Sequence, residues 1–282
     1  MRSGLLGVIG YPIGHTASPA MVNAALRHAG VEGILYIPVE VRPRDLKAFC
    51  SSAPLMNFLG FNVTIPHKIT IIKHLSELKT SAKEVEAVNV VKIRGGKLVG
   101  YNTDVAGVMA VIPSQQEVDG NVVVLGVGGA ARAAAIALKK RGFRDVVFVG
   151  RRASTLKVFK KFAERKKVGC RFVKFGSMEL ADIMRETELL INATPVGMYP
   201  NTNSTPIPGK LLHSDMTVFD MVYNPVETKL LKTAKARGAK TINGVRMLVA
   251  QGAEALKIWL GIEADQRVME KAVIEALEGF GK

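Results

Sequence analysis

The segment at residues 122–132 restricts the possible folds of this chain more than any other. It reads VVVLGVGGAAR, so four apolar residues lead into a glycine-rich turn, and an alanine-rich run from Ala133 to Leu138 follows and ends at Gly142. This order predicts a buried strand, a tight turn and a helix. Glycines let a backbone approach a pyrophosphate closely, and the N–H groups and positive dipole at a helix N-terminus bind its charge. By itself the pattern fits a phosphate-binding βα unit and an ordinary α/β turn equally well.

The surrounding segments predict a two-domain α/β protein. Strand-like and helix-like segments alternate over 282 residues, which favours parallel sheets covered by helices. We expect strands near residues 5–9, 35–39, 61–65, 122–125, 146–149, 170–173, 189–193 and 218–220, and a hairpin of residues 88–93 and 98–101 that turns at Gly95-Gly96. We expect helices at residues 20–29, from Pro43, from Pro66, from Thr103 or Asp104 to about 112, at 247–260 and at 265–277.

The last two predicted helices follow one another with no strand between them. We expect them to pack back on the first domain, which is then discontinuous. The predicted domains are residues 1–105 plus 243–282, and residues 106–242, with the polar stretch 113–120 near the start of the second sheet.

Composition argues against several classes of protein. No apolar run approaches the roughly 18 residues of a membrane span, and the apolar stretch near the N-terminus is too short for a signal peptide, so we expect a cytoplasmic protein. Cys50 and Cys170 lie far apart, which predicts neither a disulfide framework nor a metal site. The net charge of +15 fits nucleic acid, anionic small ligands or a lysine-rich surface. Because no zinc-finger spacing, basic tail or RNA-binding aromatic motif is present, we expect no nucleic-acid partner.

The strand predicted after the glycine-rich unit bears on the choice of cofactor. In an NAD-binding unit an acidic residue about 20 residues further on accepts a hydrogen bond from the ribose hydroxyl. Here the strand ends in Gly150-Arg151-Arg152, with no acid at its tip. A guanidinium binds a 2′-phosphate, whereas a carboxylate repels it. The segment therefore favours NADP over NAD.

Two other segments place polar groups where a ligand can meet them. Asn62 and Thr64 alternate with apolar residues, so they share one face near the end of a predicted strand, and Lys68 is expected one turn into the next helix. Taken alone, Lys68 is expected to be an ordinary surface residue, because lysine is mostly exposed in proteins. Asp104 fits a helix cap or a catalytic acid, and Thr16 and Ser18 fit an anion site or simple capping beside a helix start.

A series of short motifs extends in order over essentially the whole chain. They are Thr16-Ala-Ser18-Pro, Asn62-Val-Thr64-x-Pro-x-Lys68, Ala87-Val-Asn89, Asn102-Thr-Asp104-x-x-Gly107, Gly126-x-Gly-Gly-Ala130, Asn192-Ala-Thr194-Pro-x-Gly-Met198, Asp220-x-x-Tyr223-Asn-Pro225 and Met247-Leu-x-x-Gln251-Gly252. In order and spacing they closely resemble the shikimate dehydrogenases. A chance match of so many ordered motifs is much less plausible than a chance match of any one of them.

The resemblance implies a discontinuous α/β substrate domain, a Rossmann-like NADP domain, and the reversible reduction of 3-dehydroshikimate to shikimate in aromatic biosynthesis. It implies that Lys68 and Asp104 form the catalytic pair, and that the substrate is bound by Thr16, Ser18, Asn62, Thr64, Asn89, Tyr223 and Gln251. It places NADP(H) against Gly126, Gly128, Gly129, Ala130, Arg151, Arg152, Thr194, Met198, Met221 and Gly244. No metal is implied, and the protein is expected to be a monomer or a homodimer.

Two positions depart from the family pattern. Thr16 stands where serine is usual, which keeps the hydroxyl donor but adds a methyl group, and Gly150 stands where an asparagine commonly precedes the arginine. Two alternatives stay open. One is a quinate or quinate/shikimate dehydrogenase linked to NAD, against which Arg151 argues. The other is a protein that keeps the fold but only binds a ligand or nucleic acid.

Overall fold

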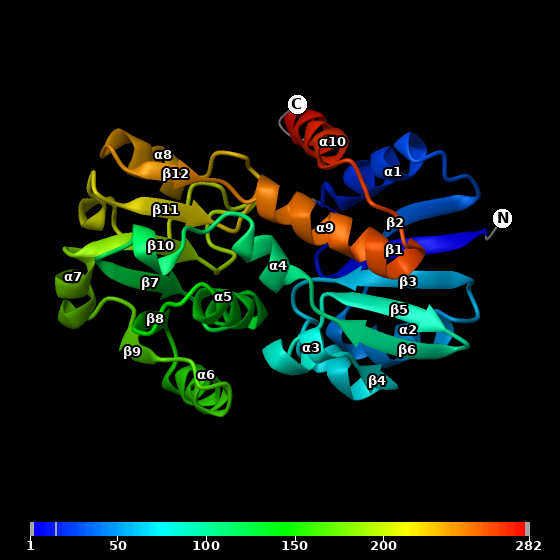
Figure 1. Cartoon of the computed structure of the whole chain (residues 1–282), viewed down its shortest axis with the longest axis horizontal. Coiled ribbons are helices and arrows are strands. Elements are labelled where there is room, and N and C mark those ends of the chain that lie inside the picture. The colour runs from blue at the N-terminus through cyan, green and yellow to red at the C-terminus, as the bar shows by residue number, and fades with distance from the viewer. Residues whose placement is uncertain (1–2, 15, 280–282) are drawn as a thin grey trace. The chain divides into compact units, whose positions relative to one another are not determined.

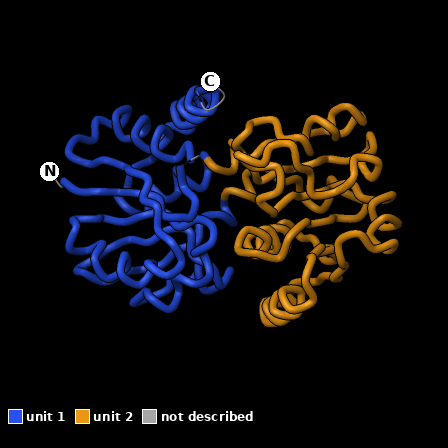
Figure 2. Tube along the Cα trace, turned by 180° about the vertical axis from the view of Figure 1, so that it is seen from behind, with its two compact units in different colours: residues 1–106, 249–282 blue, residues 107–248 orange. Residues whose placement is uncertain are grey.

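The computed structural model describes residues 3–14 and 16–279, which form two compact units. Unit 1 is Met1–Ala106 with Val249–Lys282, and unit 2 is Gly107–Leu248 (Figure 2). The C-terminal segment therefore belongs with the N-terminal one, as its two consecutive helices predict. The second division between the units falls inside helix α9 (Val245–Leu260), not before it at residue 243.

Unit 1 is built on a mixed sheet in the order β2-β1-β3-β5-β6-β4 (Figure 1). Its strands are β1 (Gly4–Gly10), β2 (Ile34–Glu40), β3 (Phe58–Val63), β4 (Glu77–Leu78), β5 (Val90–Arg94) and β6 (Lys97–Tyr101). Strands β1, β2 and β3 are parallel, whereas β5 runs antiparallel to both β3 and β6. The expected hairpin of β5 and β6 is confirmed, and Gly95 and Gly96 both adopt the positive φ that its tight turn requires.

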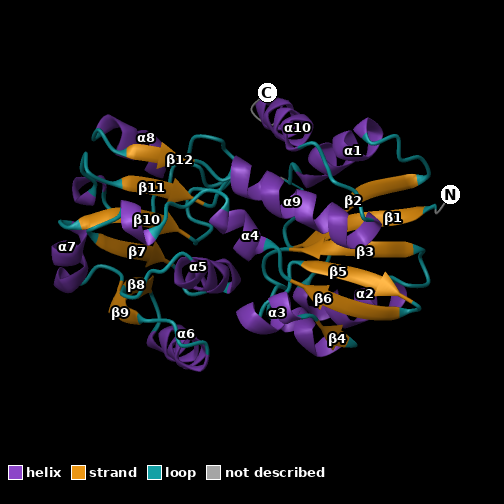
Figure 3. Ribbon diagram, in the orientation of Figure 1, coloured by secondary structure: helices purple, strands orange, loops and turns teal. Residues whose placement is uncertain are grey.

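Helices cover both faces of this sheet. The helices of unit 1 are α1 (Ser18–His28), α2 (Leu46–Ser52), α3 (Thr80–Val85), most of α9, and α10 (Gln266–Gly279), with short 3₁₀ turns η1 (Pro43–Asp45) and η2 (Thr70–His74). Helix α4 (Asp104–Met109) begins in unit 1 and ends in unit 2. Helix α9 lies in front of the sheet and α2 behind it (Figure 3). Phe49 on α2 packs edge-on against Phe61 of β3, with ring centres 5.1 Å apart. Helices α1 and α10 pack side by side, so the C-terminal helices complete the domain.

Unit 2 is an all-parallel sheet in the order β12-β11-β10-β7-β8-β9. Its strands are β7 (Asn121–Leu125), β8 (Val146–Gly150), β9 (Cys170–Lys174), β10 (Thr187–Asn192), β11 (Thr217–Asp220) and β12 (Lys240–Ile242). Helices α5 (Gly129–Lys140), α6 (Ala153–Arg165), α7 (Met178–Met184) and α8 (Lys229–Ala236) connect them, with 3₁₀ turns η3 (Gln115–Glu117) and η4 (Gly209–Leu211). The order of strands changes direction at β7, as in a doubly wound dinucleotide-binding fold.

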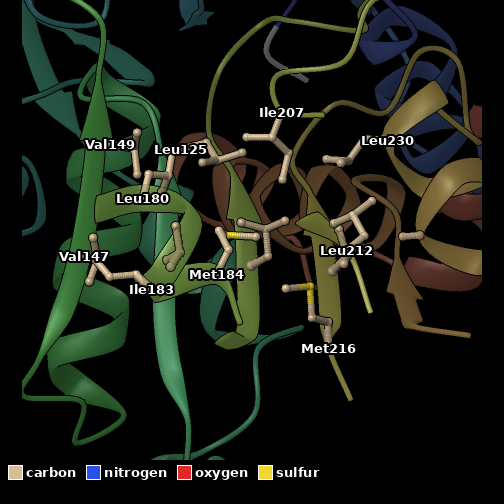
Figure 4. Close-up of a cluster of buried hydrophobic side chains, with 14 of the residues drawn as sticks. Leu125, Val147, Val149, Leu180, Ile183, Met184, Ile207, Leu212, Met216 and Leu230 are labelled. Atoms are coloured by element: carbon tan, nitrogen blue, oxygen red, sulfur yellow. The ribbon is translucent and has the colours of Figure 1, made fainter. Parts of the chain in front are cut away.

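The core of unit 2 explains why its strands read as unbroken apolar runs. Val147, Leu125 and Leu190 on three different strands are fully buried, because helices cover the sheet. Figure 4 shows Leu180, Ile183 and Met184 of α7 packed against these strands, together with Ile207 and Leu212 from the chain between β10 and β11. Apolar burial on this scale is the main stabilising contribution to the unit.

Some local expectations differ from the structure. No helix begins at Pro66: residues 65–69 form turns, and only η2 follows from Thr70. Strand β12 was not predicted, because Lys240-Thr-Ile242 is short and two of its three residues are exposed. Within the described residues, no helix is both long and apolar enough to cross a membrane.

Candidate active site

Four chain segments meet at one edge of the unit 1 sheet. Strands β1 and β3 are parallel neighbours in which Val8 pairs with Asn62, so both end at this edge. Strand β5 begins here and β6 ends here, because Asn62 pairs with Val90 and Val90 pairs with Tyr101. The segments around Ser18, Lys68, Asn89 and Asp104 therefore converge although they are far apart in sequence.

Lys68 and Asp104 form a close ion pair at this edge. Lys68 Nζ donates a hydrogen bond of 2.6 Å to Asp104 Oδ2. Asp104 is almost completely buried, with 4% of its side chain exposed, whereas 18% of Lys68 is exposed. The carboxylate is therefore held inside the protein, while the ammonium group can still reach a ligand.

The turn that carries Lys68 is held by hydrogen bonds to two other parts of unit 1. Its backbone carbonyl accepts a hydrogen bond of 2.7 Å from the Val88 amide. The imidazole of the neighbouring His67 is fully buried, and its Nε2 lies 2.6 Å from the Val41 carbonyl oxygen. Lys68 therefore sits on a rigid turn and not, as the sequence predicted, one turn into a helix.

Asp104 does not cap the helix that it begins. The side-chain oxygen of Asn102 accepts hydrogen bonds from the backbone amides of Asp104 and Val105, at 3.0 and 3.4 Å, which is the role of an N-cap residue. The expectation that Thr103 or Asp104 supplies the cap is therefore wrong. Because Asn102 satisfies the helix terminus, the Asp104 carboxylate is available to Lys68.

Asn89 joins three elements around the ion pair. Its Nδ2 lies 2.9 Å from Thr103 Oγ1, 3.0 Å from Asp104 Oδ1 and 3.1 Å from Gln251 Oε1, and its Oδ1 accepts a hydrogen bond from the Thr103 amide at 2.7 Å. Gln251 comes from α9, so this network brings the C-terminal segment to the same edge. The predicted site residues Asn89, Asp104 and Gln251 thus form one buried polar cluster together with Thr103.

Asn62 and Thr64 lie at the end of β3. Asn62 is buried, donates to the Asn89 carbonyl at 3.0 Å, and accepts a hydrogen bond of 2.6 Å from the Tyr36 hydroxyl. Thr64 follows the strand directly and is half-buried. Tyr36 was missed in the sequence, where it is one aromatic residue in an alternating strand.

Thr16 and Ser18 flank the start of α1 in the segment that follows β1. The Ser18 amide donates to Thr16 Oγ1 at 3.2 Å, so the threonine at this position supports the first turn of the helix. Ser18 is buried, with 7% of the residue exposed. Both residues belong to the polar edge described above.

In unit 2, the glycine-rich turn lies where the strand order reverses. Gly126 follows β7 with a φ of 109°, and its amide donates to the Val149 carbonyl at 2.8 Å. Gly128 is the N-cap residue of α5, and Gly129 and Ala130 begin that helix. A Cβ atom at Gly128 would meet nothing within 4 Å. The protein itself does not require glycine here, whereas a phosphate that approaches the helix N-terminus does.

The two arginines that follow β8 are exposed at the same edge of the unit 2 sheet. Arg151 comes directly after the strand, and Arg152 is the N-cap residue of α6. Gly150 has its own packing reason, because a Cβ atom there would lie 2.7 Å from Leu156 Cδ2. An asparagine at position 150 would therefore require the Leu156 side chain to shift.

The segments that follow β10 and β11 are held by the buried carboxylate of Asp220, a motif residue for which the sequence predicted no role. Asp220 Oδ1 accepts hydrogen bonds from Asn192 Nδ2 and the Val222 amide, and its Oδ2 accepts one from Thr228 at 2.7 Å. Asn192 Oδ1 in turn accepts from the amide and hydroxyl of Thr194. Burial raises the pKa of Asp220 to about 6, against the effect of these three donors.

The remaining predicted cofactor contacts lie on these segments. Met198 follows Thr194 in the same loop, and the Met221 amide donates to the Asn192 carbonyl at 3.1 Å. Gly244 is needed because a Cβ atom there would lie 2.6 Å from the Met221 carbonyl oxygen. Tyr223 follows β11, so it belongs to unit 2, whereas the other predicted substrate residues belong to unit 1.

Comparison with known proteins identifies the family. Residues 8–91 match a model of the shikimate dehydrogenase substrate binding domain, and residues 244–274 match the shikimate 5′-dehydrogenase C-terminal domain. A shikimate dehydrogenase (NADP+) of Methanocaldococcus jannaschii is 42% identical over 98% of both chains. The chain belongs to the shikimate dehydrogenase family.

Solved structures agree with this assignment. A crystal structure of a shikimate dehydrogenase in complex with NADP+ has a TM-score of 0.86 and 39% identity, and covers 98% of this chain and 96% of its own. A quinate dehydrogenase from Corynebacterium glutamicum in complex with NAD has a TM-score of 0.84 and 30% identity, and covers 97% and 99%. The two-domain fold is therefore shared within the family by enzymes named for different substrates and cofactors.

Proposed function

We propose that this protein catalyses the NADP-dependent, reversible reduction of 3-dehydroshikimate to shikimate in the biosynthesis of aromatic amino acids through chorismate. The observation that carries the proposal is the buried Lys68–Asp104 pair, 2.6 Å apart at the polar edge of unit 1. Family membership supports the reaction, because the relative at 42% identity bears this activity in its name.

The pair suits the proton-transfer half of a carbonyl reduction. A nicotinamide cofactor held by unit 2 would supply the hydride. As an ammonium group, Lys68 donates a proton to the carbonyl oxygen, and as a neutral amine it accepts the hydroxyl proton in the reverse direction. Asp104 fixes the position of Nζ through this hydrogen bond. Because the two groups are this close, we assign the catalytic role to both.

Several residues at this edge are suited to bind the polar ring. Asn89 and Gln251 place amide groups beside Asp104, and Asn62 and Thr64 lie on the adjacent strand end. Thr16 and Ser18 supply hydroxyl groups beside a helix start, where an anion is stabilised. We assign to these residues, with Tyr223, the binding of the substrate's hydroxyl and carboxylate groups.

The cofactor residues of unit 2 fit NADP(H). The open space at Gly128 leaves the N-terminus of α5 accessible to a pyrophosphate. Arg151 and Arg152 are exposed beside the end of β8 with no acidic residue at its tip, so they favour a 2′-phosphate. Gly126, Gly129, Ala130, Thr194, Met198, Met221 and Gly244 complete the proposed set of contacts.

The proposed partner is therefore a small molecule, and we place the enzyme in the cytoplasm as a monomer or homodimer. The +15 charge is then explained by attraction of an anionic cofactor and substrate. A protein that binds nucleic acid would instead show binding that weakens steeply with salt, without oxidation of a cofactor.

An assay of the purified protein with shikimate or quinate, each with NADP or NAD, tests the proposal. The absorbance of the reduced cofactor measures the rate of each reaction. We expect the highest kcat/KM with shikimate and NADP. A higher kcat/KM with quinate and NAD would identify a quinate dehydrogenase. Absence of turnover with all four combinations would contradict the assignment as an enzyme of this class.

A further inference from the structure

Tyr36 lies two strands away from the proposed substrate residue Asn62, with β1 between them. Its hydroxyl donates a hydrogen bond of 2.6 Å to Asn62 Oδ1, and only 1% of the residue is exposed. No motif of the family resemblance contains this residue. The Tyr36 hydroxyl is therefore a buried polar group that contacts a proposed substrate residue.

The hydrogen bonds of Asn62 fix the orientation of its amide. Its Nδ2 faces the backbone carbonyl of Asn89 at 3.0 Å, and a carbonyl oxygen only accepts hydrogen bonds. Nitrogen must therefore point towards Asn89 and oxygen towards Tyr36, and the Tyr36 hydroxyl must be the donor. In the reversed orientation, two acceptors would face each other at Asn89, which is costly at a buried site.

Both the backbone and the ring of Tyr36 are held by neighbouring residues. Asn23 Oδ1 accepts from the Tyr36 amide at 2.9 Å, and Asn23 Nδ2 donates to its carbonyl at 2.8 Å. The phenol ring packs against Trp259 of α9 with ring centres 6.2 Å apart, and Trp259 is anchored by a bond of 2.9 Å to the Val91 carbonyl. The hydroxyl therefore has a fixed position from which to orient Asn62.

We infer that Tyr36 is a positioning residue for substrate recognition, which it serves by holding Asn62 with one N–H directed to a hydrogen-bond acceptor of the ligand. Within residues 3–14 and 16–279, the second Nδ2 hydrogen of Asn62 has no protein acceptor. Asn62 then selects an oxygen with a free lone pair, such as a ring hydroxyl, at this point of the substrate. This inference rests on the proposed function, because it gives Asn62 a ligand with such an oxygen.

The variant Y36F removes the hydroxyl and keeps the ring against Trp259. We expect kcat/KM for shikimate to fall about 3–10-fold, which is the effect of one buried hydrogen bond. The fall should come mainly from a higher KM for shikimate, and KM for NADP should not change. The same change should have no effect on kcat/KM in the N62A background, since the two residues act through one contact. Y101F in strand β6 of the same unit is the matched control and should behave as wild type.

A second measurement does not depend on activity. The side-chain amide of Asn62, assigned by its loss in N62A, should exchange with solvent more rapidly in Y36F than in wild type, as followed by 15N NMR. Unchanged exchange, or unchanged KM for shikimate in an active Y36F, would overturn the role of Tyr36 and leave the proposed reaction intact. A wild-type protein with no activity would contradict the proposed reaction, and the exchange rates would then decide whether Tyr36 orients Asn62.

Discussion

The polar edge of unit 1 and the corresponding edge of unit 2 are built in opposite ways. In unit 1, the side chains form hydrogen bonds with one another: Lys68 with Asp104, and Asn89 with Asp104 and Gln251. In unit 2, the glycine-rich turn presents backbone to open space at Gly128, and Arg151 is exposed. The contrast fits the two tasks that we propose, because proton transfer requires fixed distances, whereas a phosphate is bound by free N–H groups and cations.

Unit 2 nevertheless contains a bonded network beneath its open loops. Asp220 connects the ends of β10 and β11 through Asn192, and connects them to α8 through Thr228. The network stabilises the backbone from which Thr194 and Met221 extend. The loops that we propose to contact the cofactor are therefore supported from beneath by buried hydrogen bonds.

The largest expected effect is that of K68A, which removes the ammonium group from the unit 1 edge. We expect kcat to fall about 10²–10⁴-fold, the usual contribution of general acid–base catalysis, with the affinity for NADPH retained. Steady-state kinetics, NADPH fluorescence titration and circular dichroism separate these effects. K73A, at an exposed lysine of η2, is the matched control. Near-normal turnover by a folded K68A variant would show that the ion pair is not catalytic.

The buried carboxylate of unit 2 predicts a pH-dependent effect on stability. Because the pKa of Asp220 is raised from 3.8 to about 6, the folded protein holds a proton between these pH values that the unfolded chain has lost. Its contribution to the free energy of unfolding therefore falls as the pH rises from about 4 to 6, and stays constant above that range. The shift corresponds to about 3 kcal/mol.

The variant D220N has no titrating group at this position, so it isolates this effect. The difference in unfolding free energy, D220N minus wild type, should increase by about 3 kcal/mol between pH 4 and pH 7 in urea denaturation. D215N, at an exposed carboxylate of the same unit, should show a difference that hardly changes over this range. A pH-independent difference for D220N would mean that Asp220 is ionised throughout.

Arg151 is the corresponding test of the open edge. R151A should raise KM for NADPH about 10–100-fold, the range for a charged hydrogen bond, and should leave KM for NADH and kcat nearly unchanged. K157A on α6 controls for the loss of one surface charge. Equal increases in both Michaelis constants would argue against contact with the 2′-phosphate.

The smallest effect is expected at Asn102. N102A removes the N-cap of α4, which should lower the free energy of unfolding by about 1 kcal/mol, with a smaller loss of activity because Asn89 still holds Asp104. Thermal and urea denaturation measure the first effect, and N201A in an exposed loop is the control. A loss of activity as large as that of K68A would show that Asn102 holds the ion pair together.

Local sequence rules predicted most of the secondary structure for physical reasons that act over a few residues. The apolar run before Gly126 predicted β7, and Gly95-Gly96 predicted the hairpin of β5 and β6. The rules were wrong at Pro66, where a proline that fits a helix start lies in a turn, and they missed β12, whose residues are mostly exposed. Strand β12 forms because it pairs with β11, and pairing with a remote strand is not visible in a short segment.

The order of residues along the chain specifies the kinds of chemical groups available, the alternation of strands and helices, and, through ordered motifs, the family. Which of these groups meet depends on the folded arrangement. It assigned the helix cap to Asn102 and so released Asp104 for Lys68, and it placed Gln251 3.1 Å from Asn89, 162 residues away along the chain. Local conformational preferences extend over a few residues, whereas strand pairing and side-chain packing set the distances between groups that are remote in sequence.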